Sequence, residues 1–150
     1  MSKALIAILI LLAIIIVSIP GELKRRKRLN VYWQRLSVAN ARKWKKMFPD
    51  ASAKEIRDFL DEFSDGFAFT RRYSLKFSPN DQVMKIYRTM YPPEELFSVD
   101  ALELETFAAN LEQKYDIKFI EIWNEDLTLG KLFTTINKKD RNLSVAKSGA

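Results

Sequence analysis

The stretch ALIAILILLAIIIVSI, residues 4–19, is apolar throughout except for the hydroxyl of Ser18. Pro20 and Gly21 follow it, and five consecutive cations begin at position 24: Lys24, Arg25, Arg26, Lys27 and Arg28. A helix of 16 residues rises about 24 Å, slightly less than the roughly 30 Å of a hydrocarbon core. Lys3 can snorkel at one end, and Pro20 and Gly21 can extend the span at the other. The run therefore predicts a single-pass transmembrane anchor over residues 1–21.

A cleaved secretory signal is the alternative, because the run is intermediate in length between a signal peptide and a membrane span. The β-branched neighbours of Ser18 do not provide a cleavage site of small residues. The five cations resist translocation, and the positive-inside rule keeps them in the cytoplasm. We therefore predict an inner (cytoplasmic) membrane location, with Lys24–Arg28 at the membrane surface and residues 22–150 in the cytoplasm.

The composition limits the chemistry that a chain of 150 residues can perform. It contains no Cys and no His, which excludes disulfides, thiol nucleophiles, histidine triads and ordinary zinc sites. We expect no catalytic residues, no metal site and no enzyme activity. The net charge of +6 divides into +10 over residues 1–48 and −4 over residues 49–150. Because the positive charge is concentrated beside the apolar run, it favours an anionic membrane surface as its partner, and not nucleic acid.

Residues 22–48 have the pattern of a basic amphipathic helix, with Leu29, Trp33, Leu36, Trp44 and Met47 along one stripe. Such a stripe suits the membrane interface, and it equally suits packing on a downstream domain. Both interpretations remain open from the sequence.

Residues 49–77 combine a short helix with an aromatic segment. Ser52 and Glu55 have the spacing of a capping box. From Phe67 to Phe77, aromatic and apolar residues occupy alternate positions, which favours extended structure or a strand pair.

Residues 78–137 predict a small helical bundle. Ser78-Pro79-Asn80-Asp81 is a helix start signal. The predicted buried faces are Val83, Ile86, Tyr87 and Met90 in the first helix and Leu104, Phe107, Ala108, Leu111 and Tyr115 in the next. A last short helix spans residues 127–136, and the polar tail over 138–150 is predicted to be disordered.

Two motifs in this region resemble the acyl carrier protein family. One is Asp100-Ala101-Leu102-Glu103-Leu104-Glu105, which continues to Leu111-Glu112-Gln113-Lys114-Tyr115. The other is Leu127-Thr128-Leu129-Gly130-Lys131-Leu132-Phe133, similar to the segment that opens the last helix of the family. The resemblance covers residues 78–137, and residues 1–77 have no counterpart in the family. The expected fold class is mostly α: a transmembrane helix, a basic helix, then an acyl-carrier-like bundle.

The resemblance carries one departure. In the family a serine receives the phosphopantetheine arm, and that serine falls on Ala101. Alanine has no oxygen nucleophile, so no phosphodiester forms there. Ser98 would require a slipped register. We therefore expect no phosphopantetheine and no other cofactor.

The acidic surface remains. Residues 94–126 contain ten acids and two lysines. In the family the second helix docks on basic patches of partner enzymes, and the positions implied here are Asp100, Glu103, Glu105 and Glu112. Solvated acids that favour a helix N-terminus are the simpler interpretation.

The sequence therefore predicts a membrane-anchored, non-catalytic interaction or regulatory module on the cytoplasmic face, with a protein partner that carries a basic patch. The alternatives are an active membrane-tethered acyl carrier and an envelope-assembly subunit. The oligomeric state does not follow from the sequence.

Overall fold

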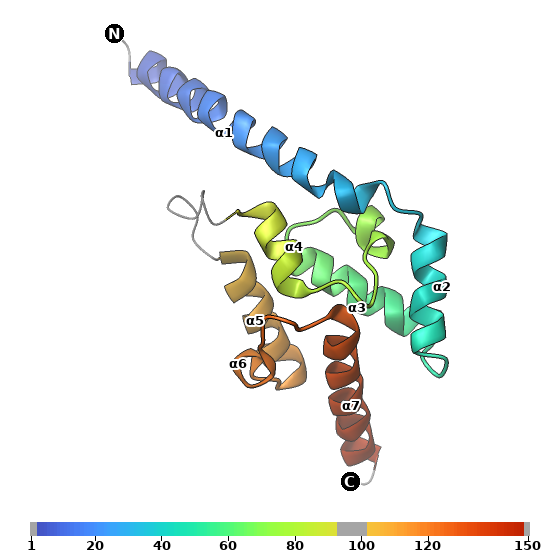
Figure 1. Cartoon of the computed structure of the whole chain (residues 1–150). Helices are drawn as coiled ribbons and strands as arrows, with labels where there is room; N and C mark the ends of the chain where they lie inside the picture. Colours follow the sequence, from blue (N-terminus) through green and yellow to red (C-terminus); the bar gives the residue numbers. More distant parts are fainter. Residues whose placement is uncertain (1–2, 93–101, 149–150) are drawn as a thin grey trace.

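A computed structural model describes residues 3–92 and 102–148. The expectation of a mostly helical chain is confirmed, and the described residues contain no β-strand. The elements are α1 (Lys3–Trp33), α2 (Ser37–Met47), α3 (Ala53–Gly66), the 3₁₀ helix η1 (Arg71–Lys76), α4 (Val83–Met90), α5 (Leu102–Tyr115), α6 (Phe119–Ile122) and α7 (Leu129–Ser148). In Figure 1, α1 extends away from a cluster formed by the other helices, with α3 near its centre.

The predicted transmembrane helix is contradicted. Across the described parts of the chain, no helix is both long enough and apolar enough to cross a membrane. The apolar run forms the first part of α1, a helix of 31 residues. The helix has no break at Gly21 and continues through the cations Lys24–Arg28. Charged side chains are costly in hydrocarbon. The last turns of α1 instead reach the domain, where Leu29 and Tyr32 are buried.

One core contains side chains from both halves of the chain. Phe63 of α3 lies at its centre, with its ring centroid 4.8 Å from Phe67, 5.3 Å from Phe77 and 5.5 Å from Phe107. Since Phe107 belongs to α5, the segment that resembles a carrier domain shares its interior with α3. Burial of such rings is the main stabilising contribution, about 1.5–3 kcal/mol for each large apolar side chain.

A second group of rings joins α2, α3 and α7. The Phe133 ring of α7 lies 5.6 Å from Trp44 and 5.3 Å from Phe59, centroid to centroid. The Trp44 side chain has 0% exposure, and its indole Nε1 donates to the Phe77 carbonyl at 2.9 Å. Asn40, also buried, donates to the Lys76 carbonyl at 2.7 Å. These bonds satisfy polar groups that burial would otherwise leave costly, and they hold α2 on η1.

The prediction of extended structure or a strand pair over residues 67–77 is wrong. Ala68 has φ of 53°, and residues Arg71–Lys76 form η1. Phe67, Phe69 and Phe77 are buried all the same. A strand needs a neighbour to satisfy its backbone, and none is available here, so the chain turns and buries the same rings through a 3₁₀ helix.

The first helix of the 78–137 segment begins later than predicted. Residues 78–81 form a turn in which the Asp81 carboxylate accepts from the Ser78 amide at 2.7 Å and from Arg35 Nη1 at 2.6 Å. Val83 N then donates to Leu127 O at 2.9 Å, and Leu129 N donates to Asp81 O at 2.9 Å. The Asp81 carboxylate therefore joins this turn to the α1–α2 turn, while the Asp81 carbonyl accepts from the first residue of α7, and α4 starts at Val83.

Two further segments can be compared with the sequence. The capping box at Ser52 and Glu55 is confirmed, with both reciprocal hydrogen bonds present. At the other end of the chain, α7 continues to Ser148, through residues for which the sequence predicts a disordered tail.

Candidate functional site

The acids of α5 point in different directions, although the sequence groups them. Glu103 is half-buried and accepts a hydrogen bond from the Tyr91 hydroxyl at the end of α4. Glu105 and Glu112 are both exposed. Their spacing of seven residues places them on one helical face, about 10 Å apart along the axis. Asp100 and Ala101 lie outside the described residues.

Burial raises the pKa of Tyr91 to about 12, and the hydrogen bond to Glu103 acts in the same direction, while Arg25 opposes both. The carboxylate of Glu103 therefore holds α5 against the end of α4. It is a structural contact, and this makes Glu103 a poor candidate for partner docking.

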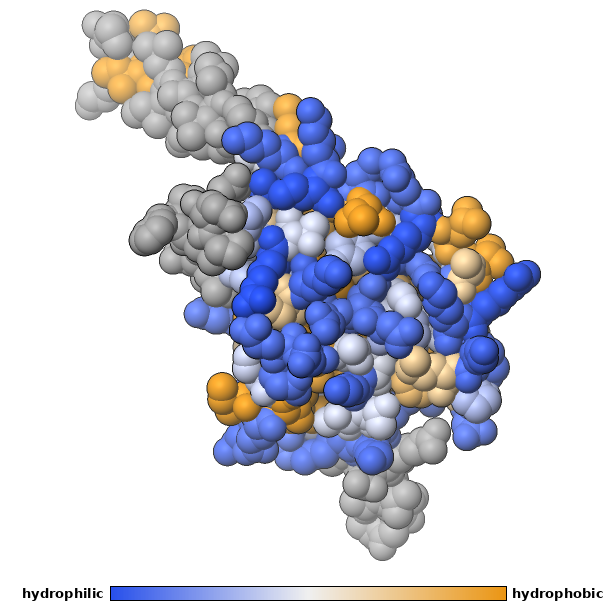
Figure 2. Space-filling model, viewed as in Figure 1, coloured by the Kyte–Doolittle hydropathy of each residue, from blue (hydrophilic) through white to orange (hydrophobic). Residues whose placement is uncertain are grey.

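Glu105 and Glu112 border an apolar depression between α5 and α6. The α5–α6 groove encloses about 310 Å³. Its lining residues are Leu104, Glu105, Ala108, Glu112, Phe119, Ile120 and Trp123. Ile120 is 77% exposed, the largest exposed fraction among the large apolar side chains that the structure describes. In Figure 2 the surface is mainly hydrophilic, and one of its hydrophobic patches lies over α6.

The turn between α5 and α6 positions the second wall of the groove. Asp116 takes φ of 52° and donates its amide to Glu112 O at 2.9 Å. Aspartate tolerates this left-handed conformation better than most residues. Its carboxylate accepts from Lys139 of α7 at 2.9 Å, a hydrogen bond that lowers the pKa of Asp116. The Phe119 ring then packs 5.8 Å from Phe107 and 5.2 Å from Trp123.

The C-terminal end of α5 is fixed to α3 by a polar cluster. The Tyr115 hydroxyl donates to Glu62 Oε2 at 2.6 Å, and Lys114 Nζ donates to the same oxygen at 2.9 Å. Burial raises the pKa of Tyr115 to about 12, and the Glu62 hydrogen bond contributes. Burial alone would lower the pKa of Lys114, but its bonds to Glu62 and Tyr115 raise it to about 12. The helix that bears Glu105 and Glu112 is thus held at both ends.

The five cations predicted at a membrane surface divide between the domain and solvent. Arg28 is half-buried, and its Nη2 donates to the Met90 carbonyl at 3.0 Å, at the C-terminus of α4. Arg25 is half-buried beside Tyr91. Lys24, Arg26 and Lys27 are exposed. A cation at a helix C-terminus is favourable, so part of this cluster joins α1 to α4.

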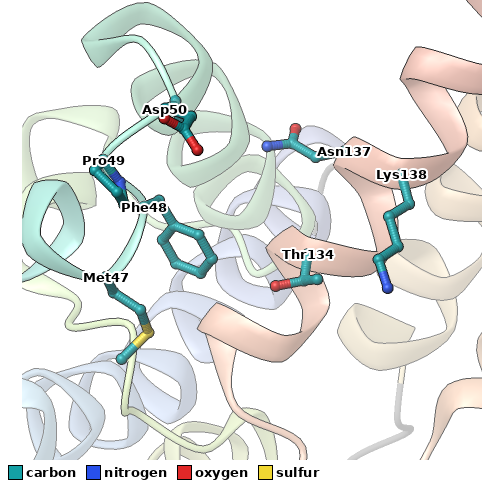
Figure 3. Close-up of a pocket in the computed structure, with 8 residues that line it drawn as sticks. Met47, Phe48, Pro49, Asp50, Thr134, Asn137 and Lys138 are labelled. Atoms are coloured by element: carbon teal, nitrogen blue, oxygen red, sulfur yellow. The ribbon is translucent and has the colours of Figure 1, made fainter.

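A second depression lies between the α2–α3 turn and α7 and encloses about 260 Å³. Figure 3 shows the Phe48 ring at its wall, with Asp50 on one side and Asn137 and Lys138 on the other. Asp50 and Lys138 are exposed. Within residues 3–92 and 102–148, no cluster of three metal-ligating side chains occurs.

Comparison with family models, curated proteins and solved structures finds no match to this chain. The groove thus has to be interpreted from its own residues. The sequence pattern indicates its two acids but not its apolar wall, because residues 116–126, which contain Ile120 and Trp123, have the pattern only of an apolar-containing connection between helices. The available signal was an isoleucine and a tryptophan at i and i+3, a spacing that brings two side chains to one face of a helix.

Proposed function

We propose that the chain is a non-catalytic protein-interaction module that binds its partner through the α5–α6 groove. The partner segment has apolar side chains flanked by Lys or Arg. The observation that carries the proposal is the exposure of Ile120 in a groove bordered by Glu105 and Glu112.

Each part of the groove has a separate role in this proposal. Exposed apolar surface rimmed by polar residues is a common feature of protein interaction sites. Trp123 and Ile120 would supply the buried contacts that carry affinity. The two exposed carboxylates would steer a basic partner and set the dependence on salt, with less effect on the dissociation rate.

The resemblance to acyl carrier proteins supports the same partner chemistry, since the second helix of that family docks on basic patches. Here the support concerns Glu105 and Glu112, because Glu103 is occupied by Tyr91. No prosthetic group takes part in the proposal.

The test begins with cross-linked complexes recovered from cells, after which the recovered partner is purified and titrated against the whole chain. Glu105→Lys together with Glu112→Lys should weaken binding by at least about tenfold, as expected for reversed charges at an interface. Ile120→Asp should weaken it similarly. Asp50→Lys with Asp58→Lys is the matched control, because both carboxylates are exposed and lie outside the groove.

Equal affinity of the partner for all three variants and the unaltered chain would exclude the groove as the docking site. If the control pair weakens binding to the same extent, the partner responds to the net charge of the chain and not to the groove. Circular dichroism of each variant establishes that the helices are retained.

A further inference from the structure

A second apolar groove lies between α2 and α3, on surface that the proposed docking function does not use. The α2–α3 groove encloses about 420 Å³. Residues that form it include Val38, Arg42, Lys45, Ile56, Arg57 and Leu75. Ile56 is buried, Leu75 is half-buried and Val38 is 65% exposed. The groove is therefore a largely apolar cleft that opens to solvent.

Three cations stand in this apolar setting. Lys45 Nζ donates to the carbonyls of Pro49 at 2.8 Å and Ala51 at 2.9 Å, and these bonds fix the side chain. Both acceptors are neutral, so the positive charge of Lys45 is not cancelled. Arg42 and Arg57 make neither an ion pair nor a hydrogen bond with any residue that the structure describes. Their guanidinium groups are available to an anion, and guanidinium binds carboxylate in a two-point geometry.

The charge around the groove selects the sign of the ligand. Arg42, Lys45 and Arg57 line the groove, and none of its lining residues is acidic; the acids of α3, such as Asp58, lie outside the lining. An apolar cleft with this lining is complementary to a molecule that joins an anionic head to an apolar tail. A neutral apolar ligand would leave the two arginines unused.

The size of the groove selects the class of ligand. Its volume lies within the roughly 300–1,000 Å³ of small-molecule sites. A stable protein interface would need about 800 Å² and some 20–30 residues on each side, whereas eight residues line this groove. A single extended chain with a compact head fits, and a docked protein helix would need more surface.

We propose that the α2–α3 groove binds a long-chain carboxylate, with its head between Arg42 and Arg57 and its tail along Val38, Ile56 and Leu75. This site is independent of the α5–α6 groove, because the two share no residue.

The test titrates sodium dodecanoate into the full chain by calorimetry, below the concentration at which dodecanoate forms micelles. Saturable binding of one dodecanoate per chain is expected. Arg42→Gln with Arg57→Gln should weaken it by about tenfold or more, since charged hydrogen bonds are lost. Dodecanol, which has the same tail and no charge, should bind more weakly than dodecanoate.

Matched variants distinguish binding in the groove from nonspecific electrostatic or hydrophobic binding elsewhere on the chain. Lys43→Gln with Lys46→Gln removes the same amount of charge from α2, at positions outside the groove, and should leave the affinity unchanged. Val38→Glu should abolish binding, whereas Val31→Glu on α1, also at an exposed valine, should not. Ile120→Asp should have no effect on dodecanoate.

The proposal is overturned if dodecanoate shows no saturable binding, or if the Lys43 and Lys46 pair weakens it as much as the arginine pair. It is also overturned if only Ile120→Asp removes the binding. If an acidic amphipathic peptide binds in a Val38-dependent manner and dodecanoate does not, the groove is a protein site and the carboxylate assignment fails. If the partner experiment at Glu105 and Glu112 fails, the result of the dodecanoate titration is not affected.

Discussion

Gly66 shows how closely α3 approaches α5. A Cβ added at this position would lie 2.8 Å from Cδ2 of Phe107, inside van der Waals contact. Gly66→Ala should therefore lower the free energy of unfolding by about 1–3 kcal/mol, the usual cost of overpacking a core. Urea denaturation measures the change.

Gly21→Ala provides the control, because a Cβ there meets no atom within 4 Å. It should be neutral or stabilise the chain by up to about 1 kcal/mol through helix propensity. Equal effects of the two alanines would show that Gly66 is not a packing position.

Tyr115 makes stability depend on alkaline pH. Its pKa is raised from the ordinary 10.0 to about 12 in the folded chain. The folded state then holds the proton more tightly, so stability is full below about pH 10 and is lost as pH rises toward 12. Tyr91 and Lys114, whose pKa values are also raised to about 12, act in the same direction.

Urea denaturation at several pH values across this window should show a falling midpoint, and Tyr115→Phe should reduce the slope. Tyr73→Phe is the control, because Tyr73 stacks on Trp33 and its hydroxyl makes no hydrogen bond with a described residue. A slope unchanged by Tyr115→Phe would mean that the hydroxyl does not titrate with folding.

Ala101 allows a test of the predicted resemblance to acyl carrier proteins. With a phosphopantetheinyl transferase and coenzyme A, the unaltered chain should show no mass increase, because no hydroxyl is present at this position. Ala101→Ser restores the oxygen. Gain of the arm in this variant would show that the enzyme still recognises the surface, whereas modification of the unaltered chain would restore the active-carrier alternative.

Single residues also show the limit of what the sequence can predict. Glu105 and Glu112, which the resemblance assigns to partner docking, are exposed in the structure. Glu103 looked equivalent, but its partner Tyr91 is 12 positions away across a different helix. Helical periodicity describes one helix at a time, and it contains no information on such a contact.

At the scale of elements, α5 and α6 contribute to the core and to the surface in different ways. Leu111 of α5 is 1% exposed, whereas Ile120 of α6 is 77% exposed. Leu111→Ala should cost about 2–5 kcal/mol of unfolding free energy, through lost burial and the cavity left behind. Ile120→Ala should change it by less than about 0.5 kcal/mol, as at other surface sites. Thermal melts of both variants compare them directly, and similar values would mean that the helix face is wrongly placed.

The elements differ in how far local sequence determines them. The Ser52 and Glu55 capping box sets the start of α3 by local hydrogen bonds, and it was predictable. The structure of residues 67–77 was not predictable in this way. The alternating rings identify the buried positions, but a strand also needs a partner strand, and the local sequence does not show whether one is present. The start of α4 was missed because Asp81 bonds to Arg35, a residue 46 positions earlier.

At the scale of the whole molecule, the shared core predicts that the carrier-like segment does not fold alone. A fragment of residues 78–150 would lose Phe63, Trp44 and Phe59, which contact Phe107 and Phe133. Circular dichroism and NMR should show an unfolded fragment, whereas residues 22–150 should retain one cooperative transition. A folded 78–150 fragment with dispersed NMR signals would contradict the single core.

The assembly of the core explains which global predictions succeeded. The mostly helical class followed from periodicity and caps. Packing of the 22–48 stripe on the domain was one of two open interpretations, and it holds for Leu29, Trp33 and Trp44. The single helix predicted over 22–48 is divided between α1 and α2, and Leu36 at the break is 74% exposed. The transmembrane prediction treated the cations as the flank of the apolar run, whereas α1 continues through them without a break.

The placement of the tryptophans gives this protein an optical readout of its own. Trp44 is fully buried in the core, and its indole N–H donates to Phe77 O. Its fluorescence emission is therefore blue-shifted, and a soluble quencher cannot reach it until the chain unfolds. Trp123 is only partly covered and lines the α5–α6 groove. Its emission is open to quenching and sensitive to whatever covers it. In a Trp33→Phe variant, which removes the third, partly buried tryptophan, quenching measured with and without a bound protein therefore reports occupancy of the groove, without any label, against an internal reference that only unfolding disturbs.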